Sequence, residues 1–303
     1  MRLAVAATPG VAIPTLEALL ESDHELVRIF TRSDAVTGRG QNMRESEVAA
    51  WARVHEIEVV KTVSANDLEG HLKDLDCVLT IAYGFILPLQ FISTPRYGFI
   101  NLHFSSLPQW RGAAPVQRAI EAGDDYLGVT VFALDAGMDT GPIYVNEKVL
   151  RNPLWRTSEA LTELATVGST AVLATLDLIE NGTIPLPQSD TGVSRAAKLH
   201  KDEAVIDWSQ PAAQLRNKIA AFYPNPIAFT IFRGAPLKLV SCALAAADLD
   251  LKPGEIHLSK AGLFIGTGEG NIEIQRVIPA GKGEMIGADW ARGIQLIQGD
   301  LCG

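Results

Sequence analysis

Three polar residues, Asn101, His103 and Asp139, have the types and the spacing that a catalytic site needs. Asn101 and His103 stand two positions apart at the end of an apolar run, Phe99–His103, which we expect to be a buried strand. Alternate residues of a strand face the same side, so the amide and the imidazole can emerge together. Both groups can donate hydrogen bonds to a carbonyl oxygen that gains negative charge, which predicts an oxyanion-stabilising site.

Asp139 lies in the loop Asp135–Gly141, after a second expected strand, Gly128–Ala133. A carboxylate beside His103 would fix the orientation of the imidazole and favour its charged form. Taken singly, each of the three residues fits a structural role better than a catalytic one. Because all three are expected at the ends of two neighbouring strands, catalysis is the better interpretation of the set.

The sequence offers no convincing nucleophile beside these residues. Ser105 and Ser106 follow His103 but lack the Gly-x-Ser-x-Gly pattern of a nucleophile elbow. A direct transfer between two bound substrates therefore explains the site better than a covalent intermediate.

Neither a metal site nor a dinucleotide site is predicted. The other five histidines lack ligand spacing, and the three cysteines are far apart without a Cys-x-x-Cys motif. The motif Gly266-x-Gly268-x-Gly270 lies between two expected strands, where it fits a hairpin turn. A dinucleotide site would need a strand before the motif and a helix after it.

The elements that position these residues form an alternating pattern in the first part of the chain. Strands alternating with helices predict an α/β fold, with a Rossmann-like, mostly parallel sheet and crossover helices. Ligands of such sheets gather at the carboxyl ends of the strands. The expected strands are Arg2–Ala6, Leu26–Phe30, Cys77–Thr80, Phe99–His103 and Gly128–Ala133, and the expected helices are Ile13–Leu20, Val48–Val54, Pro115–Ala122 and Ser158–Asn181.

The pattern changes after Asn181. Residues 183–203 contain prolines, a glycine and several polar residues, so we expect a linker. One helix, Pro211–Ala221, and several short strands separated by turns follow it, and they predict a small, OB-like β-barrel. The expected domains are therefore 1–182 and 204–303, joined by the linker 183–203.

Composition describes a soluble globular protein, since 47% of the residues are hydrophobic and 20% are charged. No apolar run reaches the ~20 residues of a membrane helix, and the first residues do not resemble a secretion signal. A cytoplasmic protein without a membrane span is expected. The net charge of −9 falls within residues 1–203, because residues 204–303 contain nine basic and nine acidic residues. This balance disfavours nonspecific binding of nucleic acids.

Arg39 stands between two glycines in the segment VTGRGQN, after the second expected strand. Two interpretations are open from the residues alone. Arg39 is either a solvated charge on a loop or a finger that reaches a phosphate or another part of a substrate.

Three segments resemble the formyl-transfer core of enzymes that use 10-formyltetrahydrofolate. They are AYGFILP at 82–88, NLHFSSLPQWRGAAPVQRAI at 101–120 and GVTVFALDAGMDTG at 128–141. The continuation Trp-Arg-Gly-Ala-Ala-Pro at 110–115 narrows the resemblance to the methionyl-tRNA formyltransferase family. AAKLHKDEAVIDWSQP and IAAFYPNPIAFT are similar to the linker and C-terminal segments of that family, so the resemblance covers nearly the whole chain.

The resemblance implies roles for individual residues. Asn101, His103 and Asp139 match the catalytic trio of the family, and Arg39 corresponds to an arginine that grips the acceptor end of the tRNA. The positions that match the folate-contacting residues are Tyr83, Gly84, Phe85, Ile86, Leu87, Ser105, Ser106, Leu107, Pro108 and Asp135.

Several positions depart from the family pattern. Ser106 replaces an apolar residue, Gln109 replaces a common arginine, and Gln41 and Asn42 follow Arg39 where lysines are frequent. Residues 204–303 are neutral where a basic face is expected. The chemistry is expected to be intact, whereas tRNA is expected to bind less tightly or through other contacts.

The resemblance implies transfer of the formyl group of 10-formyltetrahydrofolate to the α-amino group of initiator methionyl-tRNA. The expected partners are the folate co-substrate and the tRNA, and the protein is expected to be a monomer without a metal. One alternative is an amino-sugar-nucleotide or glycinamide ribonucleotide formyltransferase, which has the same first domain. The other is a folate- or RNA-binding protein without turnover.

Overall fold

The computed structural model describes residues 1–37, 42–246, 249–297 and 299–303, and it divides the chain into two compact units. Each unit is assembled from three stretches of the chain. The first unit comprises Met1–Gly112, Tyr126–Val149 and Leu161–Arg195. The second comprises Ala113–Asp125, Leu150–Ala160 and Ala196–Gly303.

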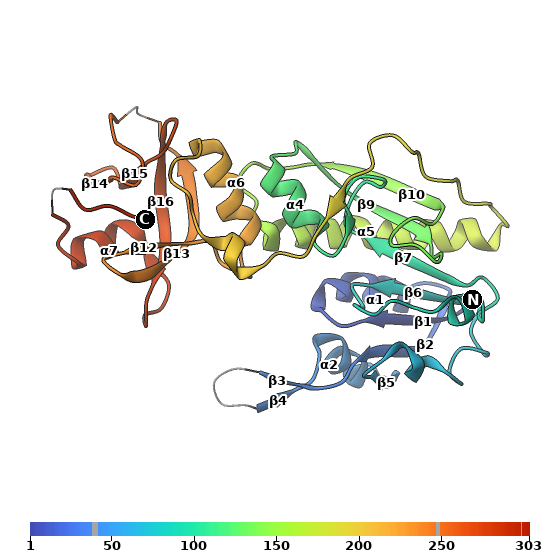
Figure 1. Cartoon of the computed structure of the whole chain (residues 1–303). Coiled ribbons are helices and arrows are strands. Elements are labelled where there is room, and N and C mark those ends of the chain that lie inside the picture. The colour runs from blue at the N-terminus through green and yellow to red at the C-terminus, as the bar shows by residue number, and fades with distance from the viewer. Residues whose placement is uncertain (38–41, 247–248, 298) are drawn as a thin grey trace. The chain divides into compact units, whose positions relative to one another are not determined.

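The first unit is built on a seven-stranded sheet with the order β10-β9-β7-β6-β1-β2-β5 (Figure 1). Neighbouring strands from β7 to β5 are parallel, and β9 pairs with β7 in the antiparallel direction. The predicted α/β fold with a mostly parallel sheet is therefore confirmed. The strands are β1 (Arg2–Ala7), β2 (Glu25–Arg32), β5 (Glu58–Thr62), β6 (Cys77–Ile81), β7 (Phe99–His103), β9 (Tyr126–Ala133) and β10 (Ile143–Leu150).

Helices and short strand pairs complete this unit. They are the helices α1 (Ile13–Leu20), α2 (Glu47–Val54), α3 (Leu89–Ile92) and most of α5 (Thr157–Glu180), the single turns η1 (Gly10–Ala12) and η2 (Ala65–Leu68), and the short strands β3 (Ala35–Thr37), β4 (Asn42–Arg44) and β8 (Arg111–Gly112).

The two outermost strands, β5 and β10, were not predicted from the sequence. Both lie at an edge of the sheet, and each of them carries exposed residues along part of its length. A half-exposed edge strand lacks the continuous apolar run that marks the buried strands in the middle of the sheet. The central strands are completely or largely buried, as in β6, all five residues of which are buried.

The two faces of β7 carry different side chains: one face packs against α5, and the other carries polar residues. Leu102 faces α5 so closely that a Cβ added at Gly168 would lie 2.8 Å from the Cδ2 atom of Leu102. Asn101 and His103 alternate with Leu102, so their side chains project from the other face of the strand. The close approach of α5 thus fixes β7 from one side and leaves the opposite side to the polar residues.

By length and composition alone, α5 could cross a membrane, and it is the one such helix in the part of the chain that the structure describes. The expectation that no segment reaches that length therefore has an exception. Leu164, Val172 and Leu176 of α5 are buried inside the protein. Core helices of soluble proteins pass the same test, so the helix is weak support for a membrane span.

The second unit combines helices with an antiparallel half-barrel sheet. The order of the sheet is β12-β13-β16-β15-β14, with β17 paired to β16. This confirms the expected small β-structure of the C-terminal part, and β15 and β16 pair directly across the turn Gly266–Gly270, as predicted. The strands are β12 (Phe229–Phe232), β13 (Ala235–Leu244), β14 (Ile256–Leu258), β15 (Leu263–Gly266), β16 (Asn271–Pro279) and β17 (Met285–Ile286), after β11 (Arg195–Ala196). The helices are α4 (Pro115–Ala122), α6 (Ala212–Phe222), α7 (Gly287–Gly293) and the turn η3 (Lys201–Ala204).

Gly141 allows the loop after β9 to close, because a Cβ at this position would lie 1.8 Å from the carbonyl oxygen of Ala133. We expect Gly141→Ala to lower the free energy of unfolding by about 1–3 kcal/mol, as overpacking of a closed site does. Urea denaturation measures this change. Gly283→Ala is the control, since nothing lies within 4 Å of a Cβ added there. Equal stability of the two variants would contradict the close approach.

Candidate active site

His103 is buried at the end of β7, with 6% of its surface exposed. Its Nε2 atom lies 3.0 Å from the carbonyl oxygen of Trp110. A carbonyl oxygen can only accept, so Nε2 carries a hydrogen and donates it to Trp110. Nδ1 lies 3.9 Å from Oδ2 of Asp139, too far for a direct hydrogen bond. The structure thus brings His103 and Asp139 together, as expected, and leaves a short gap between them.

Burial of the imidazole lowers the pKa of His103 below its ordinary value of 6.5. The Asp139 carboxylate and the hydrogen bond to Trp110 both act to raise this pKa, but desolvation is the larger effect. Asp139 therefore acts in the expected direction without producing a charged histidine at neutral pH. With its hydrogen on Nε2, the uncharged ring offers a lone pair on Nδ1, on the side of Asp139.

Asn101 lies two residues before His103 on the same face of β7. Its Oδ1 atom accepts a hydrogen bond of 2.6 Å from the hydroxyl of Thr80 in β6. Within the described residues, no protein group is hydrogen-bonded to the Nδ2 atom of Asn101. The amide hydrogens are therefore available to a substrate.

The loop that carries Asp139 does not reach the site in the expected way. Because β9 is antiparallel to β7, its carboxyl end lies beside the start of β7, where Ala133 pairs with Ile100. The expectation that both loops follow adjacent carboxyl ends is wrong. The loop instead folds back towards the end of β7, and Asp139 adopts a left-handed backbone conformation with φ of 55°.

Gln188 holds this returning loop, a role that the sequence did not suggest. Its Nε2 donates to the carbonyl oxygens of Asp139 at 2.9 Å and Gly141 at 2.8 Å, and its Oε1 accepts from Nη2 of Arg111 at 2.6 Å. The backbone N–H of Gly112 donates to Oδ2 of Asp139 at 2.8 Å. These bonds fix both the main chain and the carboxylate of Asp139.

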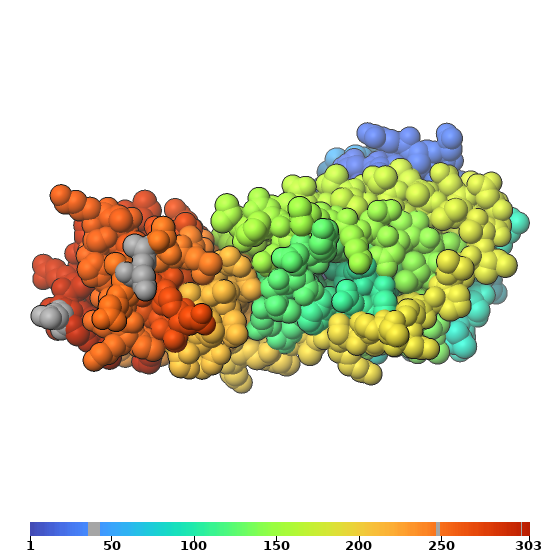
Figure 2. Space-filling model, turned by 90° about the horizontal axis from the view of Figure 1, so that it is seen from above, coloured from blue at the N-terminus to red at the C-terminus, as the bar shows by residue number. Residues whose placement is uncertain are grey.

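Gln188 belongs to the segment 183–195, which was expected to be part of a linker. Most residues of this segment are exposed, and Figure 2 shows it in yellow on the surface. A single glutamine between Pro187 and Ser189 gives no sequence pattern that marks a supporting role. Only the folded chain shows its contacts with the loop.

Asp135 is a predicted folate-contacting residue, but its carboxylate is hydrogen-bonded within its own loop. Its Oδ1 atom accepts hydrogen bonds from the N–H of Gly137 at 2.9 Å and from the hydroxyl of Thr140 at 2.8 Å. The carboxylate therefore stabilises the turn that leads to Asp139.

The predicted folate-contacting turn Ser105–Pro108 is held by two strands. The hydroxyl of Thr130 in β9 donates to the Ser105 carbonyl at 2.6 Å and accepts from the Leu107 N–H at 3.0 Å. From β10, Asn146 donates to the Leu107 carbonyl at 2.8 Å and accepts from the Ser106 hydroxyl at 2.8 Å. Ser106, unusual in the family pattern, thus has a specific partner in this chain.

The second predicted folate segment, 83–87, begins shortly after β6, which is the parallel neighbour of β7. Tyr83 and Leu87 are buried in the core and are 4% and 8% exposed. Gly84 and Ile86 are exposed and Phe85 is half-buried. The buried side chains anchor the segment, and the Ile86 side chain faces outwards.

Two further positions were named from the sequence, Arg39 and Gln109, and the structure describes only the second. Arg39 lies outside the described residues, between β3 and β4, which pair in the antiparallel direction. Gln109 is exposed, and its backbone carbonyl accepts a hydrogen bond of 2.6 Å from Ser105.

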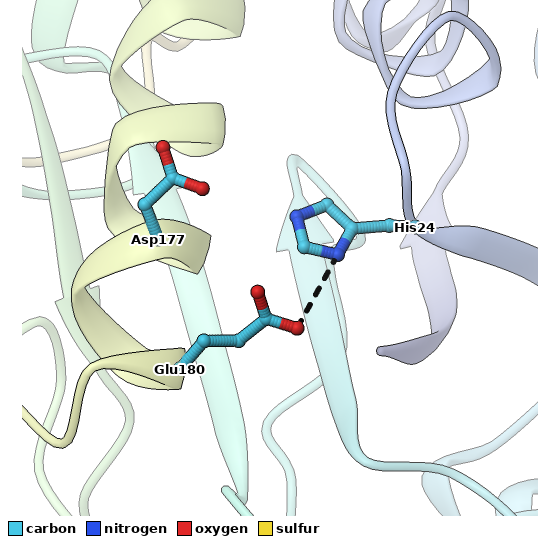
Figure 3. Close-up of side chains that lie close together, drawn as sticks. All are labelled: His24, Asp177 and Glu180. Carbon is cyan, nitrogen blue, oxygen red and sulfur yellow. Dashed lines mark ion pairs between the residues drawn. The ribbon is translucent and has the colours of Figure 1, made fainter.

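Three side chains away from this site lie close enough together to hold a metal ion, namely His24, Asp177 and Glu180 (Figure 3). Their possible ligand atoms lie within 4.8 Å of one another. The amino group of Met1 already contacts Nδ1 of His24 at 3.2 Å and Oε1 of Glu180 at 3.3 Å. These contacts account for the arrangement without a metal, so we assign no site to it.

Models of two domain families match the chain. The formyl transferase model matches residues 1–174, and the formyl transferase C-terminal domain model matches residues 198–295. Both parts of the chain thus correspond to one class of enzyme, the formyltransferases, which use folate derivatives.

Curated proteins with similar sequences identify the family within this class of enzymes. The chain is 42% identical to a methionyl-tRNA formyltransferase of Streptomyces griseus, over 100% of both chains, and 40% identical to one of Mycobacteroides abscessus, over 98% of both. The chain belongs to the methionyl-tRNA formyltransferase family, whose members formylate initiator methionyl-tRNA in translation initiation.

Solved structures share the fold. A methionyl-tRNA formyltransferase from Clostridium thermocellum is 16% identical, with a TM-score of 0.57 over 81% of this chain and 94% of that one. An N-formyltransferase from Helicobacter canadensis, solved with folinic acid and dTDP-3-aminofucose, is 18% identical, with a TM-score of 0.70 over 90% of this chain and 98% of that one. At these identities the likeness extends to the fold alone.

The pKa of His103 can be measured by NMR titration of its ring hydrogens. We expect a value below 6.5, and a further decrease in Asp139→Asn, because this change removes a carboxylate that raises the pKa. The unfolded chain then binds the proton more tightly, so the free energy of unfolding should fall as the pH drops through about 6.5. A pKa above 6.5, or an increase in Asp139→Asn, would contradict the uncharged imidazole.

Proposed function

We propose that this site transfers the formyl group of 10-formyltetrahydrofolate directly to the α-amino group of initiator methionyl-tRNA. Asn101, His103 and Asp139 are the groups that act on the reacting atoms. The observation that carries the proposal is the pairing of a buried, uncharged His103, its Nδ1 lone pair towards Asp139, with the available amide hydrogens of Asn101. One group can accept a proton while the other stabilises an oxyanion.

The reaction begins when the free amine of methionyl-tRNA attacks the formyl carbon. A bond forms between the amine nitrogen and this carbon, and the formyl oxygen becomes negatively charged. The Nδ2 hydrogens of Asn101 stabilise that oxygen. The Nε2 hydrogen of His103 is engaged by Trp110, so the uncharged imidazole does not supply a second donor.

His103 instead carries the proton. Its Nδ1 accepts a proton from the attacking amine, and the resulting imidazolium is stabilised by the Asp139 carboxylate and the Trp110 carbonyl. The bond between the formyl carbon and N10 of the folate then breaks. N10 receives the proton from His103, which regenerates the uncharged imidazole and releases tetrahydrofolate.

The two predicted folate-contacting segments support this placement. The segment 83–87 and the turn Ser105–Pro108 follow the parallel neighbours β6 and β7, so both start at the same edge of the sheet. The turn is held by Thr130 and Asn146, and the buried Tyr83 and Leu87 anchor the other segment. Segments that are already ordered reduce the entropic cost of binding the formyl donor, 10-formyltetrahydrofolate, beside His103.

We assign contact with the tRNA to Arg39 and to residues 204–303. Three of the four arginines of the latter region are paired with acidic residues. The pairs are Arg233–Asp300, Arg276–Glu284 and Arg292–Asp289. Arg216 and Lys218 are half-buried and donate hydrogen bonds to Asn217 and Val205, which leaves four exposed lysines as its available cations in the part that the structure describes. The lysines are Lys238, Lys252, Lys260 and Lys282. The cytoplasmic location and the monomeric state stay predictions from the sequence.

Binding of methionyl-tRNA should weaken steeply with salt, since cations that neutralise phosphates release counterions. We expect the Kd to rise by about tenfold or more between ~50 and ~200 mM salt. Fluorescence anisotropy with labelled tRNA measures it. A flat salt response would show that phosphate contacts do not contribute.

The function is tested by supplying 10-formyltetrahydrofolate with initiator methionyl-tRNA and measuring both tetrahydrofolate release and formylated product. We expect turnover with methionyl-tRNA and none with glycinamide ribonucleotide or an amino-sugar nucleotide. His103→Ala should lower kcat by about 10²-fold or more. The exposed His55 provides the control variant His55→Ala. Activity of His103→Ala within about tenfold of the parent would rule out the assigned role of His103, and binding without product would indicate a binding protein.

A further inference from the structure

We propose that Thr80 is a positioning residue that fixes which side of the Asn101 amide faces the substrate. The inference rests on the proposed role of Asn101 as the oxyanion donor. It adds a residue from the neighbouring strand that lies outside the motif Asn-x-His and for which no role at the site was predicted from the sequence.

The register of the sheet places the two residues side by side. Thr80 in β6 and Asn101 in β7 are direct partners in a parallel pair, as are Val78 and Phe99 two positions earlier. Side chains of partnered residues share a face of the sheet. Thr80 is 5% exposed, so water does not compete freely for its hydroxyl.

The distances identify the amide atom that contacts the hydroxyl. Oγ1 of Thr80 lies 2.6 Å from the amide of Asn101, within the range of O–H···O bonds and shorter than the usual N–H···O distance. The atom facing Thr80 is therefore the oxygen, Oδ1. The carbonyl oxygen of Ile100, at 3.2 Å, is the more distant acceptor for the same hydroxyl hydrogen.

This choice of atom matters for the reaction. A carboxamide turned by 180° exchanges its NH2 group for its oxygen, with nearly the same shape. The NH2 group stabilises a formyl oxygen that gains negative charge, whereas the amide oxygen repels it. By donating to Oδ1, Thr80 selects the orientation that leaves Nδ2 free for the substrate.

Thr80→Val tests this role, because valine keeps the branched shape and removes the hydroxyl. The loss of one orienting hydrogen bond should lower kcat by about three- to tenfold. The KM for methionyl-tRNA should stay within about twofold of the parent value. Thr80→Ser should restore kcat, since serine retains the donor. Thr175→Val is the matched control, as Thr175 is also buried and its hydroxyl bonds only within α5, to Ala171.

A double-mutant cycle separates positioning from a general structural effect. In an Asn101→Ala background, Thr80→Val should cause no further loss of kcat, because the amide that it orients is absent. An equal loss in both backgrounds, or a higher KM with an unchanged kcat, would overturn the proposal. Thermal unfolding of each variant shows whether it is folded, and Thr80→Ser supplies the comparison if Thr80→Val is not.

The same variants test the role of Asn101 and the role of Thr80 separately. Asn101→Ala alone should lower kcat by about 10²–10³-fold if Asn101 stabilises the oxyanion. Full activity of Asn101→Ala would overturn the assignment of Asn101, and with it the basis for Thr80. A large loss in Asn101→Ala with parental kcat in Thr80→Val would overturn the role of Thr80 alone.

Discussion

Desolvation of one imidazole is the physical constraint on which the site depends. His103 is buried at the end of β7, and burial outweighs the nearby carboxylate in setting its protonation state. For the proposed proton transfer, the lone pair on Nδ1 has to point towards the reacting amine, so the ring must be held in one orientation. The Trp110 carbonyl holds the ring by accepting the Nε2 hydrogen. Asp139 lies on the Nδ1 side of the ring, where it would stabilise the imidazolium of the proposed mechanism.

The supporting contacts come from segments that are distant in sequence. Gln188 holds the main chain around Asp139, Thr130 holds the turn after His103, and Thr80 contacts Asn101. Each contact is a hydrogen bond made by a neutral side chain. Neutral partners can orient the groups that we propose to react without adding a charge that would interact with the proposed oxyanion or imidazolium.

The sequence predicted the buried centre of the molecule better than its edges. Phe99–His103 forms a strand with the predicted bounds, and His103 and Asp139 lie close together as predicted. The catalytic role of Asn101, His103 and Asp139 stays a prediction, made from residue types that are unusual in such a setting. The antiparallel direction of β9 was missed, since an apolar run does not show its direction. Gln188 and Thr80 were missed because a glutamine in an irregular segment and a threonine in a strand are common, and their partners are set by the tertiary fold alone.

The position of Gln188 in the sequence limits how far the chain can be shortened from its C-terminal end while the Asp139 loop keeps its hydrogen bonds. Asn101, His103 and Asp139 all precede residue 174, the last residue matched by the first formyl transferase model. A fragment that ends at residue 174 would contain every group assigned to the chemistry. It would lack Gln188, whose side chain is hydrogen-bonded both to the Asp139 loop and to Arg111. The hydrogen bonds that hold the proposed catalytic residues extend past α5 to Gln188 and to Ser194, whose hydroxyl accepts from the Trp110 N–H.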